Sequence, residues 1–373
     1  MTLFDRRPWT RWLVPLLVAF LVTAGVSGVT ALTASAGDKL APRTASQRLV
    51  DVQQARLEGL SGTIVQNADL GLPSLPGIGG SGSSDLTSMV SGSHTLRLWY
   101  AGPNRVRLSL LGSLGESDVV RNGTDLWTWA SKDKTATHRT LPLSEDSAPS
   151  MSSASPVSPQ QAADEALKAI TPSTKVSTIG TSTVAGRSAY ELLLEPRDAG
   201  SLVGSVRIAI DGKTHVPTRV QVFAKNASNP AFEVAFTSFD PTAPAASVFT
   251  FNPPPGTKVT ESGSAQPSGG HSTEAPSGDS GEKATAASAD KPKVVGSGWT
   301  SVVVAKLPTA DGSKAPGGPG SLADMLKALP KVSGSWGSGH LLQGTLFSAL
   351  LTDDGRVAVG AVAPDKLYAA LGS

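Results

Sequence analysis

The sequence predicts an α+β protein whose main part is an antiparallel sheet, curled into an incompletely closed barrel under a helical roof. Between residues 44 and 251, twelve short stretches alternate apolar and polar residues, whereas two stretches have a helical period. A smaller set of such stretches follows residue 293, beyond a segment of Ser, Gly, Ala and Pro. A long uncharged run precedes both parts. We therefore expect an N-terminal membrane helix or signal, a large sheet domain and a small α+β domain.

The uncharged run predicts export. No charged residue lies between Arg11 and Asp38, which exceeds the roughly 20 residues that a helix needs to cross a bilayer. The arginines before it are expected on the cytoplasmic side, so the rest of the chain is expected to be extracytoplasmic. The Ala-Ser-Ala sequence at 34–36 fits a cleavage site. Residues 1–37 are thus either a membrane anchor or a cleaved signal peptide, and the protein is either anchored or secreted.

The first folded element is a helix over residues 44–58. Thr44 and Gln47 have the spacing of a capping box, and Leu49, Val52 and Ala55 form one apolar stripe. Alternation then predicts six strands, at residues 61–66, 94–100, 105–110, 117–121, 125–130 and 135–141.

A second helix begins at Ser158, has Pro159 at its first position and ends before Pro172. Six more strands are expected at residues 175–183, 188–195, 205–210, 217–223, 232–239 and 248–251. Asp211 and Gly212 predict a tight hairpin turn between two of them. Prolines 253–255 end the array because proline supplies no ladder donor. This domain is expected to span residues 44–259.

Two segments do not fit a strand or a helix. Residues 261–293 contain no aromatic side chain and no aliphatic one larger than alanine, so we expect a flexible linker at 260–293. Residues 67–93 interrupt a hairpin with apolar residues scattered among Gly, Pro and Ser. This insertion is either disordered or a lid or flap that contacts a membrane.

The region 294–373 predicts a small α+β domain. Strands are expected at residues 298–307, 341–351 and 356–362, and helices at 321–329 and 364–371. The Asp-Asp-Gly sequence at 353–355 is interpreted as a hairpin turn rather than a metal or acid–base site. Trp336 is interpreted either as a plug of a small core or as an exposed partner contact.

The alternation also predicts one apolar face on the large sheet. Twelve strands at about 4.8 Å would be nearly 60 Å across, whereas two helices of about 10–12 Å each would cover less than half of that. Curvature reduces the deficit, and apolar strand faces are most often core. We nevertheless expect a cavity under the roof. Its candidate ligand-binding residues are Leu96, Leu98, Tyr100, Val106, Leu108, Leu110, Trp127, Trp129, Tyr190, Leu192, Ile208, Val220, Phe232 and Phe236.

The opposite face of the same strands is charged and is expected to lie in water. Its members are Arg97, Arg105, Arg107, Glu191, Arg207, Arg219 and Glu233. An apolar cavity suits acyl chains, because burial of each methylene contributes about 0.8 kcal/mol without any specific polar contact.

Several segments, taken in order, resemble a known family. They are Leu60-Ser61-Gly62-Thr63-Ile64, Asp125-Leu126-Trp127-Thr128-Trp129, Ser158-Pro159, Ile210-Asp211-Gly212, Val216-Pro217-Thr218-Arg219-Val220, and Phe249-Thr250-Phe251-Asn252-Pro253-Pro254-Pro255-Gly256. Over about residues 44–259 the chain resembles the LolA superfamily, which includes the lipoprotein carrier LolA, LolB, the mycobacterial lipid-binding lipoproteins and the amino-terminal domain of the anti-sigma regulator RseB. The resemblance implies a half-open β-barrel with a helical lid, which holds lipidic or acylated ligands and does no covalent chemistry.

The chain departs from this family in two ways. It has no cysteine, so it has no lipobox and no thiol-linked lipid. No residue matches the lid-locking arginine of the carrier. The appended domain is similar in arrangement to the two-domain regulator, so a sensor that regulates a membrane anti-sigma factor or another envelope partner is the alternative to a carrier. A barrel filled by its own side chains is a third possibility.

No residue pattern predicts catalysis. The five histidines lie in different predicted elements without a second ligand at metal spacing. The sequence contains no nucleophile elbow, no phosphate-binding Gly-Lys-Ser loop and no thiol. The net charge of +2, from 32 basic and 30 acidic residues, gives no footprint for nucleic acid. We therefore expect a non-enzymatic protein without cofactor or metal, whose partners are a lipid or acylated lipoprotein, a membrane and an envelope protein.

Overall fold

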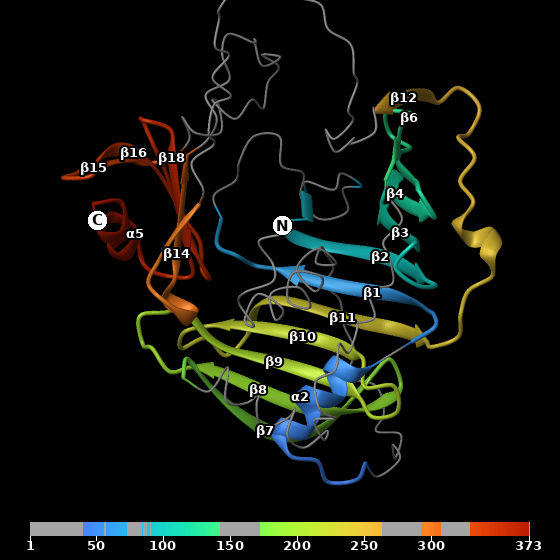
Figure 1. Cartoon of the computed structure of the whole chain (residues 1–373), viewed down its shortest axis with the longest axis horizontal. Helices are drawn as coiled ribbons and strands as arrows, with labels where there is room; N and C mark the ends of the chain where they lie inside the picture. Colours follow the sequence, from blue (N-terminus) through green and yellow to red (C-terminus); the bar gives the residue numbers. More distant parts are fainter. Residues whose placement is uncertain are drawn as a thin grey trace, which may run out of the picture.

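The computed structural model describes residues 40–55, 57–72, 84, 88–89, 91–141, 172–262, 292–306 and 329–372. Within these residues the protein is mostly β-sheet and has few helices (Figure 1). The expected membrane segment (1–37), the second helix (158–171) and the helix at 321–329, apart from its last residue, lie outside the described residues, as do most of the 67–93 insertion and of the linker. No helix that the structure describes is long and apolar enough to span a bilayer.

A twelve-stranded sheet forms the larger part of the fold. Its strands are β1 (Leu60–Ala68), β2 (Gly92–Tyr100), β3 (Arg105–Gly112), β4 (Gly115–Asn122), β5 (Asp125–Ala130), β6 (Thr135–Thr140), β7 (Thr174–Val184), β8 (Arg187–Pro196), β9 (Val203–Asp211), β10 (Pro217–Ala224), β11 (Pro230–Asp240) and β12 (Lys258–Ser262). They follow the order β12-β6-β5-β4-β3-β2-β1-β11-β10-β9-β8-β7. All neighbours are antiparallel except β12, which runs parallel to β6.

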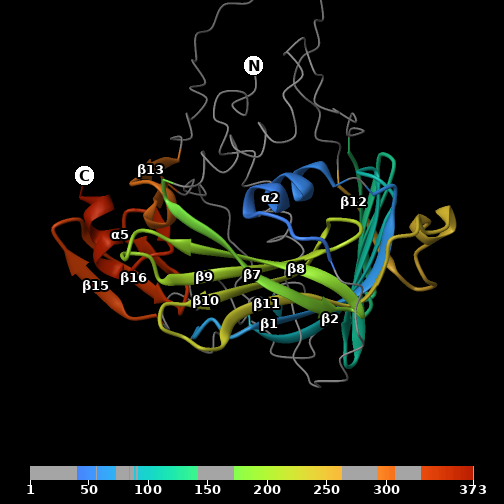
Figure 2. The same cartoon turned by 90° about the horizontal axis from the view of Figure 1, so that it is seen from below.

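This sheet is curved and open. In Figure 2 the strands β7–β11 lie across the view, whereas the teal strands β3–β6 stand nearly upright beside them. The two edge strands, β7 and β12, do not pair with each other, so the sheet does not close into a barrel within the described residues. The prediction of a large, curled, mainly antiparallel sheet is confirmed.

One predicted strand is wrong. Residues 248–251 do not join the sheet, because Ala246–Phe249 form a 3-10 helix (η2) whose Phe249 is fully buried. The twelfth strand is instead β12, which follows the prolines and pairs with β6. Alternation cannot distinguish a short strand from an extended segment that one buried aromatic residue anchors.

The predicted tight turn at Asp211-Gly212 is also wrong. β9 ends at Asp211 and β10 begins at Pro217, so the connection is longer, and His215 has a positive φ of 60°. Oδ1 of Asp211 accepts hydrogen bonds from the N–H groups of Lys213 and Thr214, at 3.1 and 2.7 Å. The Asp side chain therefore caps a wider loop instead of starting a two-residue turn.

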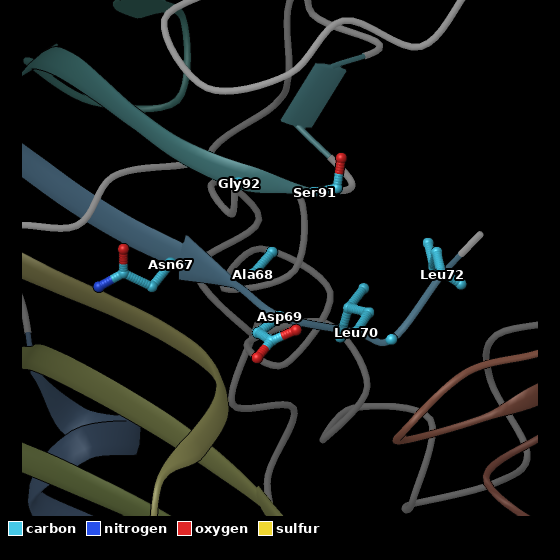
Figure 3. A pocket seen from close by; sticks show the side chains of 8 residues that line it. Asn67, Ala68, Asp69, Leu70, Leu72, Ser91 and Gly92 are labelled. Carbon is cyan, nitrogen blue, oxygen red and sulfur yellow. The ribbon is translucent and has the colours of Figure 1, made fainter. Parts of the chain in front are cut away.

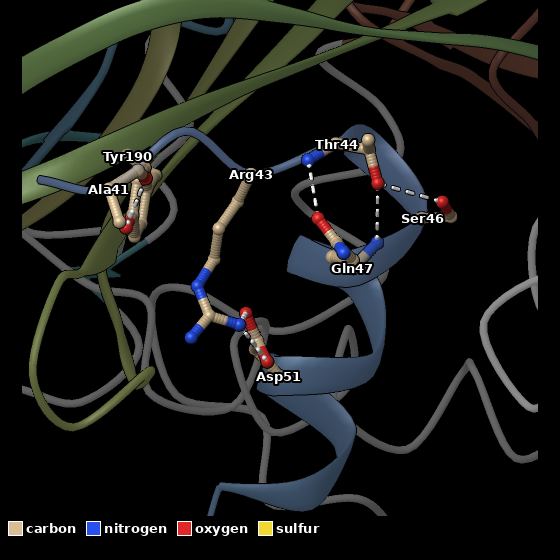
Figure 4. A network of polar contacts seen from close by, with 7 residues as sticks. All are labelled: Ala41, Arg43, Thr44, Ser46, Gln47, Asp51 and Tyr190. Carbon is tan, nitrogen blue, oxygen red and sulfur yellow. Dashed lines mark hydrogen bonds and ion pairs between the residues drawn. The ribbon is translucent and has the colours of Figure 1, made fainter. Parts of the chain in front are cut away.

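The first helix, α2 (Ala45–Gln54), begins as predicted. Thr44 Oγ1 accepts from the Gln47 N–H at 3.2 Å, and Gln47 Oε1 accepts from the Thr44 N–H at 2.9 Å (Figure 4). This reciprocal capping box is confirmed. The helix is four residues shorter than predicted, since it ends at Gln54 and not at 58.

The second sheet belongs to the C-terminal region. Its strands are β13 (Lys293–Val295), β14 (Val302–Lys306), β15 (Lys331–Gly334), β16 (Gly337–Gln343), β17 (Ser348–Thr352) and β18 (Arg356–Gly360), and their order is β13-β14-β18-β17-β16-β15. Gly298–Thr300 forms a 3-10 helix (η3) before β14. The strands β13 and β15 were not predicted. The predicted strand at 341–351 is two strands joined by a turn at 344–347.

Helix α5 (Pro364–Leu371) covers one face of this sheet, as predicted. Leu367 and Leu371 pack with Leu350 and Ala358 in one buried cluster. Trp336 is 7% exposed, belongs to this cluster and stacks on Tyr368, with 5.4 Å between the ring centroids. The Trp is therefore the core plug and not the exposed contact. The turn predicted at 353–355 is confirmed, because it joins β17 to β18 and Gly355 has a φ of +83°.

Candidate functional site

The candidate site is the apolar face of the large sheet, which we call the inner face. Residues that pair directly across neighbouring strands point to the same side of a sheet. Leu96 pairs with both Ile64 and Leu110, and Leu98 pairs with Leu108. On the other half of the sheet, Ile208 pairs with Leu192 and Val220, Ile210 with Tyr190, and Val222 with Phe232. The register therefore brings twelve of the fourteen predicted residues to one face. They are Leu96, Leu98, Tyr100, Val106, Leu108, Leu110, Tyr190, Leu192, Ile208, Val220, Phe232 and Phe236.

Trp127 and Trp129 are not on the inner face, which corrects the prediction. Trp127 pairs with Val120, and Val120 pairs with Arg107 on the opposite, outer face. There Phe251 lies over both indoles, with ring centroids 5.4 and 6.2 Å away. The chain after β11 packs on the outer face of β3–β5, so this part of the sheet is apolar on both sides. The presence of two Trp residues on one face of a strand therefore did not indicate which face of the sheet is the inner face.

Among the described residues, three different parts of the chain cover the inner face. Helix α2 covers one end of it, where Leu49 packs with Tyr190, Leu192 and Ile210. The helix is fixed there because Tyr190 Oη donates to Ala41 O at 2.8 Å (Figure 4). Arg48 Nη1 also donates to Glu191 O at 2.6 Å.

Met89, from the 67–93 insertion, covers the other half. It packs against a cluster of Ile64, Leu96 and Leu110, all of which are fully buried. Two buried polar side chains hold this segment: Gln66 Nε2 donates to Met89 O at 3.1 Å, and His94 Nε2 lies 3.1 Å from Ser88 O. This described part of the insertion therefore lies on the inner face.

The C-terminal sheet provides the third cover, which the sequence did not predict. Leu346 from the β16–β17 turn is buried in one cluster with Val203, Val206 and residues of β10 and β11, and Phe347 and Trp299 pack against that cluster. Leu346-Phe347 is an apolar pair where alternation would call for one polar residue. The same stretch also contains the apolar pairs Leu341-Leu342 and Leu350-Leu351, so the sequence pattern does not single out this contact.

Between these covers, part of the inner face is only partly buried. Leu98, Leu108, Val234 and Phe236 retain solvent exposure, in contrast to the fully buried Leu96. Ile208, Val220 and Phe232 are likewise partly buried at the edge of the C-terminal cover. The inner face is thus apolar from β3 to β8 in the order of the sheet, and its middle is covered less than its ends.

A pocket lies at the end of β1 and the start of β2, which we call the junction pocket (Figure 3). It has a volume of about 380 Å³, and its lining includes Leu70, Leu72 and Ser91. Leu70 packs into the cluster that contains Leu346, and Leu70 O accepts from the Thr345 N–H at 2.7 Å. This junction pocket therefore borders both the inner face and the β16–β17 turn.

The outer face differs from the prediction of a fully hydrated charged surface. Asp118 and Asp211 are each 1% exposed and Glu191 is 7% exposed. Each is paired: Asp118 with Arg107, Asp211 with Arg187, and Glu191 with Arg219. Burial costs a carboxylate several kcal/mol unless it is paired. The arginine partners therefore allow these three carboxylates to be buried on the outer face instead of exposed to water.

The ion pair of Asp211 shifts its titration. Burial raises the pKa of the carboxyl, but hydrogen bonds from Arg187 and Thr214 lower it more, and the pKa falls to about 2. On the outer face of β6, the hydrogen bond with Asp125 and that with Glu261 raise the pKa of His138. In the part of the chain that the structure describes, no three His, Asp or Glu residues lie close enough to hold a metal ion.

A family model described as a predicted periplasmic protein (DUF2092) matches residues 83–261, slightly less than half of the chain. No curated protein matches significantly.

Among solved structures, MucB of Pseudomonas aeruginosa, in its complex with MucA, is 16% identical; the match covers 88% of this chain and 97% of that one, with a TM-score of 0.42. A LolA superfamily protein from Nitrosomonas europaea is 11% identical, with 56% of this chain and 99% of that one covered and a TM-score of 0.20. Lipoprotein LppX of Mycobacterium tuberculosis is 10% identical, with 52% and 92% covered and a TM-score of 0.28. The chain is similar to proteins of the LolA superfamily, the group that its sequence motifs resemble.

Proposed function

We propose that this protein binds the acyl chains of a lipid or a lipoprotein on its inner face and carries them outside the cytoplasm without covalent chemistry. The observation that supports the proposal is an inner face that is apolar over seven adjacent strands, from β3 to β8 in the order of the sheet, and is only partly buried between its three covers. Each methylene buried there contributes about 0.8 kcal/mol, so a long chain binds without a polar anchor.

The mechanism is equilibrium capture. An apolar chain lies along Leu98, Leu108 and Phe236, replaces contacts that the covers make with one another, and leaves when a membrane or a partner competes for it. The twelve predicted residues that share the inner face are the ligand-binding residues of this proposal. Trp127 and Trp129 are not among them.

Binding of a fluorescent fatty acid tests the proposal. Leu98 and Arg97 are neighbours on β2 and point to opposite faces. Leu98→Gln is expected to weaken binding about tenfold, since it puts an unsatisfied amide on the inner face, whereas Arg97→Gln is expected to leave it unchanged. Native mass spectrometry of protein purified from cells is expected to show bound lipid. Empty protein that refuses the fatty acid would exclude the function.

A sensor is the second candidate function. It is supported by the contact between the C-terminal sheet and the inner face, because a ligand there would reach both sheets. In this role the protein would report lipid to a membrane anti-sigma factor or another envelope protein. Co-purification of such a membrane protein only from lipid-depleted cells, or only from lipid-supplied cells, would favour the sensor over the carrier.

The extracytoplasmic location and the division of the chain also belong to the proposal. Residues 1–37 act as an anchor or a signal, residues 44–259 as the lipid-binding domain, 260–293 as the linker and 294–373 as the second domain. The description of the matching family as periplasmic agrees with this location. Separation of cells into membrane, soluble envelope and medium fractions distinguishes anchor from signal, and protein found only in the cytoplasm would contradict both.

A further inference from the structure

The turn between β16 and β17 (residues 344–347) has an unusual environment. Turns that join two antiparallel strands normally lie in water. Here Leu346 is only 9% exposed and shares a buried cluster with Val203 and Val206 of the other sheet, and Phe347 packs against the same cluster. The Thr345 N–H donates to Leu70 O at 2.7 Å, which fixes the turn against β1.

This turn covers residues that the proposed ligand needs. Ile208, Val220 and Phe232 pack against the cluster of Leu346. All three are among the candidate ligand-binding residues of the inner face. An acyl chain that lay along them would occupy the space that Leu346 and Phe347 now fill.

In the part of the chain that the structure describes, a backbone bridge and side-chain hydrogen bonds hold the C-terminal sheet in this place. The Leu202 N–H donates to Ala361 O at 2.8 Å beside a bridge between Ser201 and Val362. Trp299 Nε1 donates to Thr174 Oγ1 at 2.8 Å. Thr300 Oγ1 donates to an exposed carboxylate oxygen of Asp198 at 3.1 Å. Each such hydrogen bond contributes modestly to the free energy of docking, and water can replace the exposed one between Thr300 and Asp198.

The junction pocket gives access to this contact. Leu70 and Leu72 line it (Figure 3), and the backbone oxygen of Leu70 is also the acceptor for the Thr345 N–H of the β16–β17 turn.

We propose that the C-terminal sheet is a built-in competitor for the ligand, in which Leu346, Phe347 and Trp299 occupy the inner face until an acyl chain replaces them. The inference rests on the proposed function and adds its regulation. Because one apolar surface cannot contact both occupants, ligand binding and docking of the C-terminal sheet oppose each other by the same free energy. Ligand binding therefore frees the turn, and fixing the turn in place excludes ligand.

A disulfide across the junction tests the inference in the full-length protein. Ser201 and Val362 form an antiparallel bridge, and the Cα atoms of facing residues in such bridges are close enough for a disulfide. The chain has no cysteine of its own, so Ser201→Cys with Val362→Cys gives a single possible pair. The probe is the fluorescent fatty acid cis-parinaric acid. The oxidised protein is expected to bind it about tenfold more weakly than the same protein after reduction, because only the undocked fraction is competent.

The reduced form serves as a matched control for the two substitutions. Equal affinity in both redox states, with clear binding, would overturn the competitor and leave the proposed function intact. Absence of binding in the wild-type protein and in the reduced variant would overturn the proposed function, and the inference with it.

A second variant is expected to change the affinity in the opposite direction. Phe347→Ser removes part of the competitor and is expected to raise affinity for cis-parinaric acid by at least about threefold. Val303→Ser, an exposed residue of the same sheet, is the control and is expected to change nothing. If Phe347→Ser weakens binding instead, Phe347 is part of the ligand's wall and the competitor is excluded.

Discussion

At the scale of single residues, Asp211 shows how the outer layer of the large sheet is built. Its carboxylate receives two hydrogen bonds from Arg187, at 2.7 and 2.9 Å, and three from the loop to β10, at 2.7, 2.8 and 3.1 Å. It is 1% exposed. One side chain therefore joins β8, β9 and the following loop, and its charge is compensated where water is excluded.

Asp211→Asn is expected to lower the free energy of unfolding at pH 7 by about 3 kcal/mol, because it leaves Arg187 without its carboxylate. Because the folded-state pKa of Asp211 is depressed to about 2, its contribution is complete above the unfolded pKa of about 4 and is lost as pH falls from there through the folded pKa. Urea unfolding at pH 7 and at pH 2.5 measures both effects. The difference between wild type and variant should shrink at the lower pH; a constant difference would mean that Asp211 acts through packing alone.

The matched control is Asp353→Asn, which alters an exposed carboxylate paired with Lys331 at 3.1 Å. Exposed pairs of this kind contribute about 0–1 kcal/mol, so little change is expected.

At the scale of elements, the edge strand β12 depends on His138. Its Nε2 lies 2.9 Å from Asp125 Oδ1 and its Nδ1 lies 2.8 Å from Glu261 Oε2 of β12. Ionised carboxylates only accept hydrogen bonds, so both contacts require the doubly protonated imidazolium. The ring also stacks on Trp127, with 4.3 Å between centroids.

The pairing of β12 with β6 is therefore expected to weaken as pH rises. The pKa of His138 is raised in the folded protein, so its stabilising contribution is complete below the unfolded pKa of about 6.5 and is lost as pH rises through the folded pKa. Hydrogen-exchange protection of the β12 amides, corrected for intrinsic rate, should fall across that range. His138→Gln should abolish the pH dependence, and protection that stays constant with pH in wild type would contradict the prediction.

At the scale of elements, the sequence pattern was also sufficient to locate most strands of the large sheet. Alternation located eleven of the twelve strands of the large sheet. Most of these strands have one apolar face and one more polar face, and this difference appears in the sequence as alternation. It failed at residues 248–251, where Phe249 anchors a 3-10 helix on the outer face. It also could not assign Trp127 to a face, since the outer face of β3–β5 is itself packed by that segment.

At the scale of the whole molecule, the two sheets share one hydrophobic cluster. Leu346 belongs to the C-terminal sheet by chain but packs with Val203 and Val206 of the large sheet. Contacts of this kind couple the stability of elements that are far apart in the sequence.

Leu346→Ala is therefore expected to destabilise the docked state by about 2–3 kcal/mol. Faster hydrogen exchange should appear in the amides of β9–β11, although the substitution lies in the other sheet. Val303→Ala, on the exposed side of the C-terminal sheet, is the control. Exchange that rises only within the C-terminal sheet would show that the two sheets are energetically independent.

The sequence by itself determined eleven strands of the large sheet, the capping box of α2 and the apolar pattern of the inner face. These follow from local spacing, since a strand's two faces and a helix's first turn are encoded within a few residues. The tertiary structure alone decided which face Trp127 joins, that Asp118, Glu191 and Asp211 are buried in ion pairs, and that Leu346 lies on the inner face. The contacts of Trp127 with Phe251 and of Leu346 with Val203 join residues more than a hundred positions apart, which no local pattern encodes. The partners of the three ion pairs are 11 to 28 positions apart, and they meet only because their strands pair side by side.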